Sequence, residues 1–259
     1  MNTPIYIISL KDNDSRRKLC LETLKKAHVE DKFINIFDAK TYSDVNKEYL
    51  LDDYTKGVDL KLSFNRKIHV SGELTKNEIG CAFSHISIYQ HIVDNNIEKA
   101  MIFEDDAVIP ETFLTRLEDC EALPVEKYDV INFGCYAGVR SPIYPINPRI
   151  TFKNKEYYLH LVGWGSKLID SLFSRRRVIF SAHCYLITKA GCKKLLDVTQ
   201  TNLYSKEKYK NLKIQLPADY LLGYIALNGL KTYEFNDSGF VGTSGAPSHI
   251  GDRLPHKIE

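Results

Sequence analysis

The sequence predicts an α/β fold in which a mainly parallel sheet is flanked by helices. Two observations carry this expectation. Short apolar, β-rich runs alternate along the chain with segments whose apolar residues recur at helical spacing, an order typical of βα units. The chain also has 259 residues and 44% hydrophobic content, which suits one large domain or two small lobes and excludes a disordered chain.

The first elements are a strand, a helix and a second strand. Residues 4–10 form a compact β-rich run, and Asp14 is a good N-cap for the helix that follows. That helix carries apolar residues at roughly helical intervals, namely Leu19, Leu24 and Ala27. A second strand is expected over residues 33–37. Residues 41–70 are polar and weakly periodic, so we expect a mobile or loosely helical insertion there.

A capping box predicts the start of the next helix. Thr75 can accept a hydrogen bond from a free amide of the first turn, while the Glu78 side chain reaches back to the cap. The helix then carries one apolar stripe, formed by Ile79, Phe83, Ile86, Gln90 and Val93. It should end at Asn95-Asn96, and residues 99–103 should form the next strand.

The second half of the chain continues the alternation after a loop-rich stretch. Residues 110–123 read as a helix and residues 129–134 as a strand, whereas residues 136–182 are rich in Pro, Gly and aromatic residues and predict loops and hairpins. The remaining expected elements are a strand over 184–188, helices over 189–198 and 217–228, and a last strand over 231–235.

Three adjacent acids, Glu104, Asp105 and Asp106, directly follow the expected strand over residues 99–103. Adjacent carboxylates repel one another, so placing them at the end of a buried strand is unfavourable unless a cation offsets their charge. Residues two apart on an extended segment share a face, so Glu104 and Asp106 can act together while Asp105 points elsewhere. Oxygen ligands of this kind suit Mg²⁺ or Mn²⁺. A solvated acidic turn is the alternative.

Composition and charge narrow the class of protein. The net charge of +2 gives no reason to expect nucleic-acid binding, but residues 149–213 contain fourteen Lys or Arg against four acids. That segment predicts either a solvated face or attraction to anionic lipid headgroups or a phosphorylated substrate. The start of the chain lacks the basic region of a signal peptide. Six cysteines occur without CxxC pairs, so we expect free thiols in a reducing cytoplasm.

Five separate segments resemble glycosyltransferase family 25, the bacterial lipooligosaccharide galactosyltransferases and their collagen galactosyltransferase relatives. They are Ile5–Lys11 with Arg16-Arg17, Leu74–Ile86, Phe103–Ala107, Tyr185–Leu196 and Leu216–Leu222. The resemblance implies a GT-A-type fold and a UDP-sugar donor, usually UDP-galactose. It also implies an acidic DxD-type motif that binds the donor diphosphate through Mn²⁺. Because Glu104 holds the first position of that motif here, Asp106 is the preferred metal ligand, with Glu104 or Asp105 assisting.

The resemblance also implies a reaction and a division of the chain. We expect a single GT-A-like domain over 1–259, with a nucleotide-sugar-binding half at 1–135 and an acceptor-binding half at 136–259. In-line displacement would invert the anomeric centre and form a β-linkage to the outer-core sugars of a lipooligosaccharide. The amphiphilic acceptor places this work in the cytoplasm, with peripheral contact to the inner membrane through the basic segment. The oligomeric state stays open.

The resemblance and the segment ends supply further site residues. Asp219 is our expected general base, because Pro217 suits a helix start and an acid in that first turn faces the crevice; the alternative is a helix cap. His183 is expected to contact a donor or acceptor sugar. The nucleotide is expected to contact Ser9, Leu10, Arg17, Ser84, His85 and Asp105. The alternative for Arg17 is a surface charge on the first helix, and the alternative for His85 is a satisfied, partly buried histidine. His249 is a further metal-ligand candidate, and Trp164 either stacks on an acceptor sugar or anchors a loop.

Two other functions remain open from the sequence. A glycoside hydrolase would use two carboxylates on separate elements without a metal. A non-catalytic protein that binds a sugar or nucleotide would keep the fold and the site without the reaction. Sensitivity to EDTA separates the first alternative from a metal-assisted transferase, and substitution of Asp106 separates the second.

Overall fold

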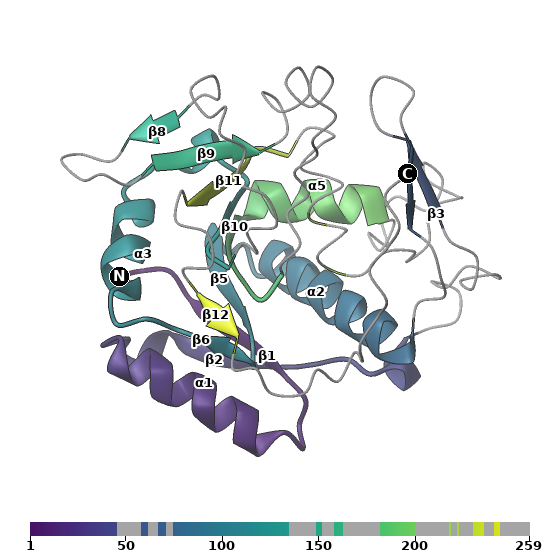
Figure 1. The fold of residues 1–259 in the computed structure, drawn as a ribbon, viewed down its shortest axis with the longest axis horizontal. Helices are drawn as coiled ribbons and strands as arrows, with labels where there is room; N and C mark the ends of the chain where they lie inside the picture. The colour runs from purple at the N-terminus through teal and green to yellow at the C-terminus, as the bar shows by residue number, and fades with distance from the viewer. Residues whose placement is uncertain are drawn as a thin grey trace.

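The computed structural model describes most of the first half of the chain and separate segments of the second. The described residues are 1–45, 58–61, 67–70, 75–134, 149–151, 158–162, 182–199, 218, 222, 230–235 and 241–243. Within these ranges the chain forms one large sheet with helices on both faces (Figure 1). The predicted α/β class is confirmed.

The sheet has eight strands and mixed polarity. Their spatial order is β2 (Ile34–Asp38), β1 (Ile5–Ser9), β5 (Lys99–Glu104), β10 (Cys184–Thr188), β7 (Val130–Asn132), β11 (Thr232–Phe235), β9 (Tyr158–Val162) and β8 (Arg149–Thr151). The β2-β1-β5 group is parallel, but β10 runs antiparallel to both of its neighbours and β9 to both of its own. Six strands therefore share one direction and two oppose it, so the expected parallel sheet is interrupted twice.

Two hydrophobic layers hold the helices to the sheet. The helices α1 (Asp14–Lys26) and α3 (Phe113–Glu121) cover one face, whereas α2 (Lys76–Asp94) and α5 (Lys189–Thr199) cover the other (Figure 1). Alternation along the strands supplies both layers: Ile7 and Phe103 pack toward α1 and α3, whereas Ile8 and Ile102 pack toward α2 and α5. Central strands buried on both faces explain the continuous apolar runs in the sequence.

The capping box at the start of α2 forms as expected. The Thr75 hydroxyl accepts from the Glu78 amide at 3.2 Å, and the Glu78 carboxylate accepts from the Thr75 amide at 2.7 Å. The helix ends at Asn95, and Asn96 follows with a φ of 53°, a left-handed conformation that asparagine tolerates. Of the predicted stripe, Ile79 and Ile86 are buried, whereas Phe83, Gln90 and Val93 are half-buried. The buried face also includes Tyr89, because both the sheet and α5 pack against the helix.

Two expectations in the first third of the chain are wrong in detail. Asp14 is the first residue of α1 rather than its cap, and Leu19 is 39% exposed while its neighbour Cys20 is buried. Leu24 and Ala27 are buried as predicted, so only the assignment of Leu19 is wrong. In the described part of residues 41–70, the structure shows a 3₁₀ turn over Tyr42–Asp44 and a pair of antiparallel strands where a loose helix was one expectation. The strands are β3 (Val58–Lys61) and β4 (Lys67–Val70), and the rest of the segment lies outside the described residues.

The remaining expectations are confirmed where the structure describes them. The strands over 129–134, 184–188 and 231–235 appear as β7, β10 and β11, and β8 pairs with β9 as a hairpin within 136–182. The helix α3 starts three residues later than predicted, at Phe113. Short elements complete the fold: 3₁₀ turns over Asp31–Phe33 and Val125–Lys127, and a two-strand ladder of β6 (Ala107–Val108) with β12 (Gly242–Thr243). Most of 217–228 lies outside the described residues.

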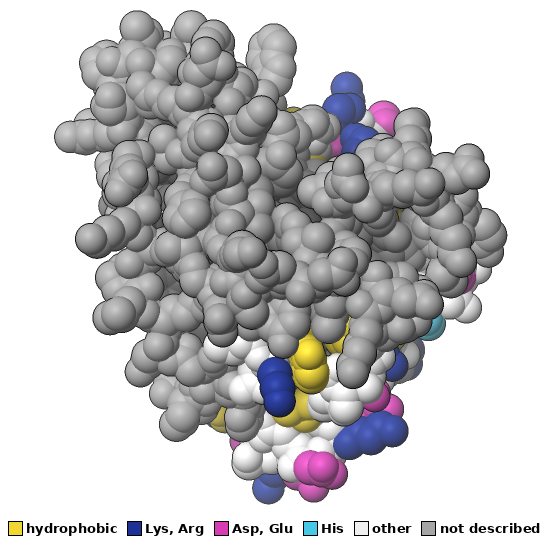
Figure 2. Space-filling view, turned by 90° about the vertical axis from the view of Figure 1, so that its right-hand side faces the viewer, with side chains coloured by type: hydrophobic (Ala, Val, Ile, Leu, Met, Phe, Trp, Pro, Cys, Tyr) yellow, Lys and Arg dark blue, Asp and Glu magenta, His cyan; other side chains and the backbone are white. Residues whose placement is uncertain are grey.

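The described surface carries charges of both signs. On the face in Figure 2, described Lys and Arg side chains lie interspersed with Asp and Glu at the lower edge. Most of the basic segment 149–213 lies outside the described ranges. No helix in the described part of the chain has the length and apolar character needed to cross a membrane. The five cysteines that the structure describes are thiols, as expected.

Candidate active site

A cavity of about 160 Å³ opens at the carboxyl ends of β1 and β5, beside the first turns of α2. This volume accommodates part of a ligand rather than a single water. The two strands are parallel neighbours, with Ile8 opposite Glu104, so the residues that follow them emerge side by side. The segment after β2 joins them, since the Ala39 amide donates to the Ser9 carbonyl at 2.9 Å. Ligands in open α/β sheets bind at such an edge.

Arg16 holds two of the three acids together. Its Nε lies 3.0 Å from Oδ1 of Asp105, and its Nη2 lies 2.8 Å from Oδ2 of Asp106. Only 14% of the Arg16 side chain is exposed, so these charge-assisted contacts are largely shielded from solvent. Arg16 comes from the first turn of α1, which the sequence places directly after β1. The guanidinium thus supplies part of the positive charge that the acids require.

Asp105 is turned toward β1 and α1. Its Oδ2 accepts from the Ser9 hydroxyl at 2.9 Å and from the Asn13 side-chain amide at 3.3 Å. Its other oxygen forms an ion pair with Arg16. Its geometry joins the first strand to the acidic turn, and both carboxylate oxygens are already engaged by the chain itself.

Asp106 is the acid that has a carboxylate oxygen available to bind a cation. Its Oδ1 is buried and has no hydrogen-bond partner among the described residues. Burial, followed by the negative charge of Glu104, raises the pKa of Asp106, and Arg16 only partly opposes this effect. A buried carboxylate oxygen without a donor is unfavourable unless a cation or a proton reaches it. Asp106 therefore fits a hard divalent cation, with Glu104 as the neighbouring oxygen donor in the same cavity.

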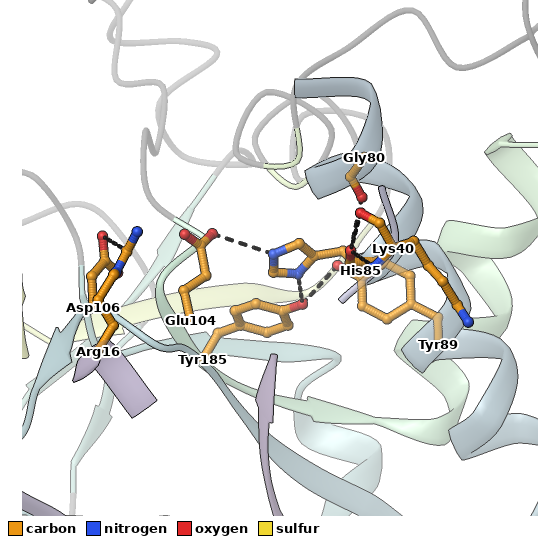
Figure 3. A network of polar contacts seen from close by, with 9 residues as sticks. Arg16, Lys40, Gly80, His85, Tyr89, Glu104, Asp106 and Tyr185 are labelled. Atoms are coloured by element: carbon orange, nitrogen blue, oxygen red, sulfur yellow. Dashed lines mark hydrogen bonds and ion pairs between the residues drawn. The ribbon is translucent and has the colours of Figure 1, made fainter. Parts of the chain in front are cut away.

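Glu104 belongs to a separate polar chain that runs into the core (Figure 3). Nε2 of His85 lies 3.3 Å from Oε1 of Glu104, and Nδ1 of His85 lies 2.7 Å from the Tyr185 hydroxyl. That hydroxyl is in turn 2.9 Å from the hydroxyl of Tyr89. Burial alone would raise the pKa of Glu104, but the hydrogen bond and charge of His85, with His183 and Arg16, hold it below its ordinary value. Glu104 is thus kept ionised.

The predicted nucleotide contacts on β1 lie at the cavity. Ser9 and Leu10 line it, and Arg17 lies behind them. Nη2 of Arg17 donates to the Leu10 carbonyl at 2.7 Å, and its Nε donates to the Ser9 hydroxyl at 3.3 Å. Arg17 fixes the loop after β1, whereas the adjacent Arg16 reaches the acids and lines the cavity.

Ser84 and its neighbours join α2 to the segment after β2. The Ser84 hydroxyl accepts from the Lys40 amide at 2.7 Å and donates to the Gly80 carbonyl at 2.8 Å. A Cβ on Gly80 would lie 2.7 Å from the Lys40 carbonyl oxygen, so only glycine permits this close approach. Ser84 lines the cavity, as predicted for a nucleotide contact, and it also has this structural role.

His183 lies on the other side of the acids. Its Nε2 is 2.8 Å from the Val241 carbonyl, and its own carbonyl accepts from the Glu104 amide at 2.9 Å. The side chain is 7% exposed, and it packs so closely on Gly134 that a Cβ there would overlap the ring. His183 thus supports the acidic turn from β10.

The other predicted residues, Asp219, His249 and Trp164, lie outside the described residues.

Beyond the predicted site residues, the cavity lining includes Arg16, Lys40, Lys76 and Cys81. The first three are cationic, and Cys81 lies one helical turn before His85. The sequence carried a signal for some of them, since Lys76 lies within the capping box and Cys81 lies in a segment of the family resemblance. The pairing of Arg16 with the acids had no local signal, because it joins residues about 90 positions apart.

The comparisons with known proteins identify a family. A family model for glycosyltransferase family 25 (LPS biosynthesis protein) matches residues 2–221. The chain is 30% identical over 113 residues to procollagen galactosyltransferase 2 of Homo sapiens, which is 44% of this chain and 17% of that protein. It is 27% identical over 195 residues to a probable inactive glycosyltransferase 25 family member 3 of Bos taurus, which is 74% of this chain and 28% of that protein.

The chain thus spans less than a third of the length of these two relatives. Among solved structures, the galactosyltransferase LgtC, in complex with donor and acceptor sugar analogues, matches 89% of this chain and 73% of its own length. The TM-score is 0.43 and the sequence identity 11%. The family model covers far more than half of the chain and includes β1, the acidic turn and α2. The chain belongs to glycosyltransferase family 25.

Proposed function

We propose that the protein transfers a hexose, galactose, from a UDP-sugar to an outer-core sugar of a lipooligosaccharide, with inversion to a β-linkage. The observation that carries the proposal is the cavity itself, where a buried, under-coordinated carboxylate lies among three cationic side chains at the carboxyl edge of the sheet. Galactose is the sugar that two of the similar proteins are named for. The description of the family as an LPS biosynthesis protein supports the proposed acceptor.

The donor diphosphate has a favourable place beside α2. Lys76 and Asn77 of its first turn line the cavity, so the positive end of the helix dipole lies close to it. Lys40 and Arg16 add two further cations. Lys40 and Lys76, which lie beside the start of α2, suit a nucleoside diphosphate better than a neutral sugar.

Asp106 and Glu104 would hold the Mn²⁺ or Mg²⁺ that the family implies. A divalent cation bound there stabilises the negative charge that develops on the departing diphosphate. Glu104 arrives ionised, because His85 donates to it, and Asp106 offers its unpaired Oδ1. Asp105 stays engaged with Ser9 and Arg16 and orients the turn.

The acceptor hydroxyl must lose a proton as it attacks, and Asp219 is our proposed general base. His183 is proposed to face the reacting sugars from the end of β10, next to the acidic turn. In this proposal, residues 1–135 bind the donor and residues 136–259 bind the acceptor. We further propose that the reaction takes place at the cytoplasmic side of the inner membrane, where the basic segment 149–213 contacts anionic lipid. Salt-sensitive binding to anionic vesicles tests that last part.

A donor screen tests the function. Purified protein is incubated with UDP-, GDP- and CMP-sugars, with Mn²⁺ or with EDTA, and release of the nucleotide is followed. We expect turnover of UDP-galactose that requires the metal and increases with an outer-core acceptor. The proposal fails if no UDP-hexose is bound, hydrolysed or transferred. Activity that persists in EDTA would instead support a carboxylate-pair glycoside hydrolase.

A second candidate is a non-catalytic protein that binds a sugar or nucleotide. The observation that favours it is the similarity to a relative named as probably inactive, which covers 74% of this chain. This candidate predicts UDP-sugar binding without turnover, and an Asp106→Ala variant that leaves cellular glycan structure unchanged. Loss of the terminal hexose from cellular glycans in that variant excludes it.

A further inference from the structure

A second cluster of metal ligands lies beside the proposed donor site. Cys81 and His85 are one turn apart on α2, so their side chains project from the same helix face. Together with Glu104 they form the group in which the Cys81 sulfur, a His85 ring nitrogen and a Glu104 oxygen all lie within 4.8 Å of one another. The three residues line one wall of the same cavity.

We propose that Cys81, His85 and Glu104 form a binding site for a thiophilic divalent cation, Zn²⁺ in the first place. The proposal goes beyond sugar transfer and does not depend on it. Thiolate and imidazole ligands favour Zn²⁺, whereas the carboxylates at Asp106 favour Mg²⁺ or Mn²⁺. The cavity would therefore take two cations of different chemistry on opposite sides of Glu104.

The distances fit a tetrahedral centre. Nitrogen and oxygen ligands about 2.1 Å from a tetrahedral Zn²⁺ stand about 3.4 Å apart. The His85 nitrogen and the Glu104 oxygen are already 3.3 Å apart. A thiolate about 2.3 Å from the ion stands about 3.6 Å from its co-ligands, so each distance from the Cys81 sulfur, now within 4.8 Å, must shorten by up to about 1.2 Å. Three protein ligands leave the fourth position open to the cavity.

The neighbours of His85 orient its ring so that Nε2 faces the proposed metal position. Nδ1 lies 2.7 Å from the Tyr185 hydroxyl, so Nε2 is the nitrogen that faces Cys81 and Glu104. The Tyr185 hydroxyl is itself held by Tyr89 at 2.9 Å (Figure 3). When Zn²⁺ binds, Nε2 would release the proton that it donates to Glu104, and Nδ1–H would donate to the Tyr185 hydroxyl, which fixes the ring as is usual for metal-binding histidines. His85 is fully buried, so water does not compete for this arrangement.

Glu104 belongs both to the proposed Zn²⁺ site and to the proposed Mn²⁺ site at Asp106, so binding at one site affects the other. A Zn²⁺ ion that takes Glu104 withdraws one carboxylate from the hard-cation position at Asp106. Zn²⁺ is therefore expected to weaken Mn²⁺ binding in the same cavity.

Cobalt spectroscopy tests the site directly. Co²⁺ is titrated into the metal-free full chain, and the thiolate-to-cobalt charge-transfer band is recorded together with the visible bands of a tetrahedral ion. We expect both in the wild type, and their loss on addition of Zn²⁺. Cys81→Ser should remove the charge-transfer band. Asp106→Asn should keep it, so the result is independent of whether the transferase proposal holds. His28→Asn is the matched control, since His28 is exposed and asparagine tolerates its φ of 60°.

Alkylation gives a second measurement that needs no variant. Zn²⁺ should protect Cys81 from iodoacetamide in the wild type, as read by peptide mass spectrometry. The other described cysteines are internal controls, because they are buried, and burial raises the pKa of Cys20 to about 12. Absence of the charge-transfer band in the wild type, its persistence in Cys81→Ser, or unchanged alkylation of Cys81 with Zn²⁺ would each overturn the proposal.

Discussion

At the scale of single residues, the two acids two positions apart in the same turn are held in opposite electrostatic states. Glu104 receives a hydrogen bond from His85, and its pKa is lowered despite burial. Burial and the charge of Glu104 raise the pKa of Asp106, whose Oδ1 has no donor among the described residues. Sequence alternation indicated that these two would act together, but it could not reveal this difference. The difference depends on His85, Tyr185 and Arg16, which come from three other elements.

Asp106→Asn should stabilise the metal-free protein at neutral pH. The raised pKa means that the Asp106 contribution to folding is most favourable below the ordinary value of 3.8 and decreases as the pH rises through the folded-state pKa. The stability advantage of the variant should therefore grow over that interval and stay constant above it. Thermal unfolding in EDTA, from acidic to neutral pH, measures it. Glu111→Gln, at an exposed acid of the following turn, is the control. A variant less stable than the wild type at neutral pH contradicts this account.

Tyr185→Phe should lower the free energy of unfolding by about 1 to 3 kcal/mol, because it leaves buried partners on His85 and Tyr89 without their hydrogen bond. The same substitution at Tyr128 is the control, since its buried hydroxyl has no partner among the described residues and Tyr128→Phe should be neutral or stabilising. Urea unfolding of both variants makes the comparison. Equal losses of unfolding free energy in the two variants would show that the hydrogen bonds of Tyr185 to His85 and Tyr89 do not stabilise the protein.

At the scale of elements, α2 positions most of the site. Its first turn, held by the Thr75 cap, lines the cavity, and its third turn brings His85 to Glu104. The sequence predicted the start of this helix within one residue, because both partners of a capping box are local. Its buried face was predicted incompletely, since packing against α5 is not encoded within the helix. The same limit explains Leu19, whose side of α1 depends on how the helix rests on the sheet.

Gly80→Ala tests the contact between α2 and the segment after β2. Alanine favours the helix by up to about 1 kcal/mol over glycine. The new Cβ, however, would lie 2.7 Å from the Lys40 carbonyl oxygen and 3.3 Å from Thr41 backbone atoms, and such overpacking costs about 1 to 3 kcal/mol. We expect a net loss of about 1 kcal/mol, with weaker UDP binding, because Lys40 must move.

Urea unfolding and a UDP titration measure the two effects of Gly80→Ala. Ser15→Ala, at an exposed position inside α1, is the control and should change stability by less than about 0.5 kcal/mol. A gain in stability for Gly80→Ala would mean that the segment after β2 is not fixed by this contact.

At the scale of the whole molecule, the sequence predicted the class of the fold and the edge of the sheet that carries the site. The run of apolar residues before Glu104 marked a strand buried on both faces, and the acids marked its end. The directions of β10 and β9 were not predictable, because pairing such as Cys184 with Phe103 joins residues about 80 positions apart. Local pattern identifies a strand without giving its neighbour. Arg16 illustrates the same limit within the site, since only the folded sheet brings it to Asp105 and Asp106.

The central claim is that Asp106 binds a divalent cation that in turn holds the donor diphosphate. Calorimetric titration of UDP into the wild type and Asp106→Asn, each with Mn²⁺ and with EDTA, tests it most directly. The account predicts binding to the wild type in Mn²⁺ and its loss in EDTA. In Mn²⁺ the variant should bind at least about tenfold more weakly, a difference of about 1.4 kcal/mol. Equal UDP affinity of wild type and variant in Mn²⁺, or wild-type binding unchanged by EDTA, would contradict it.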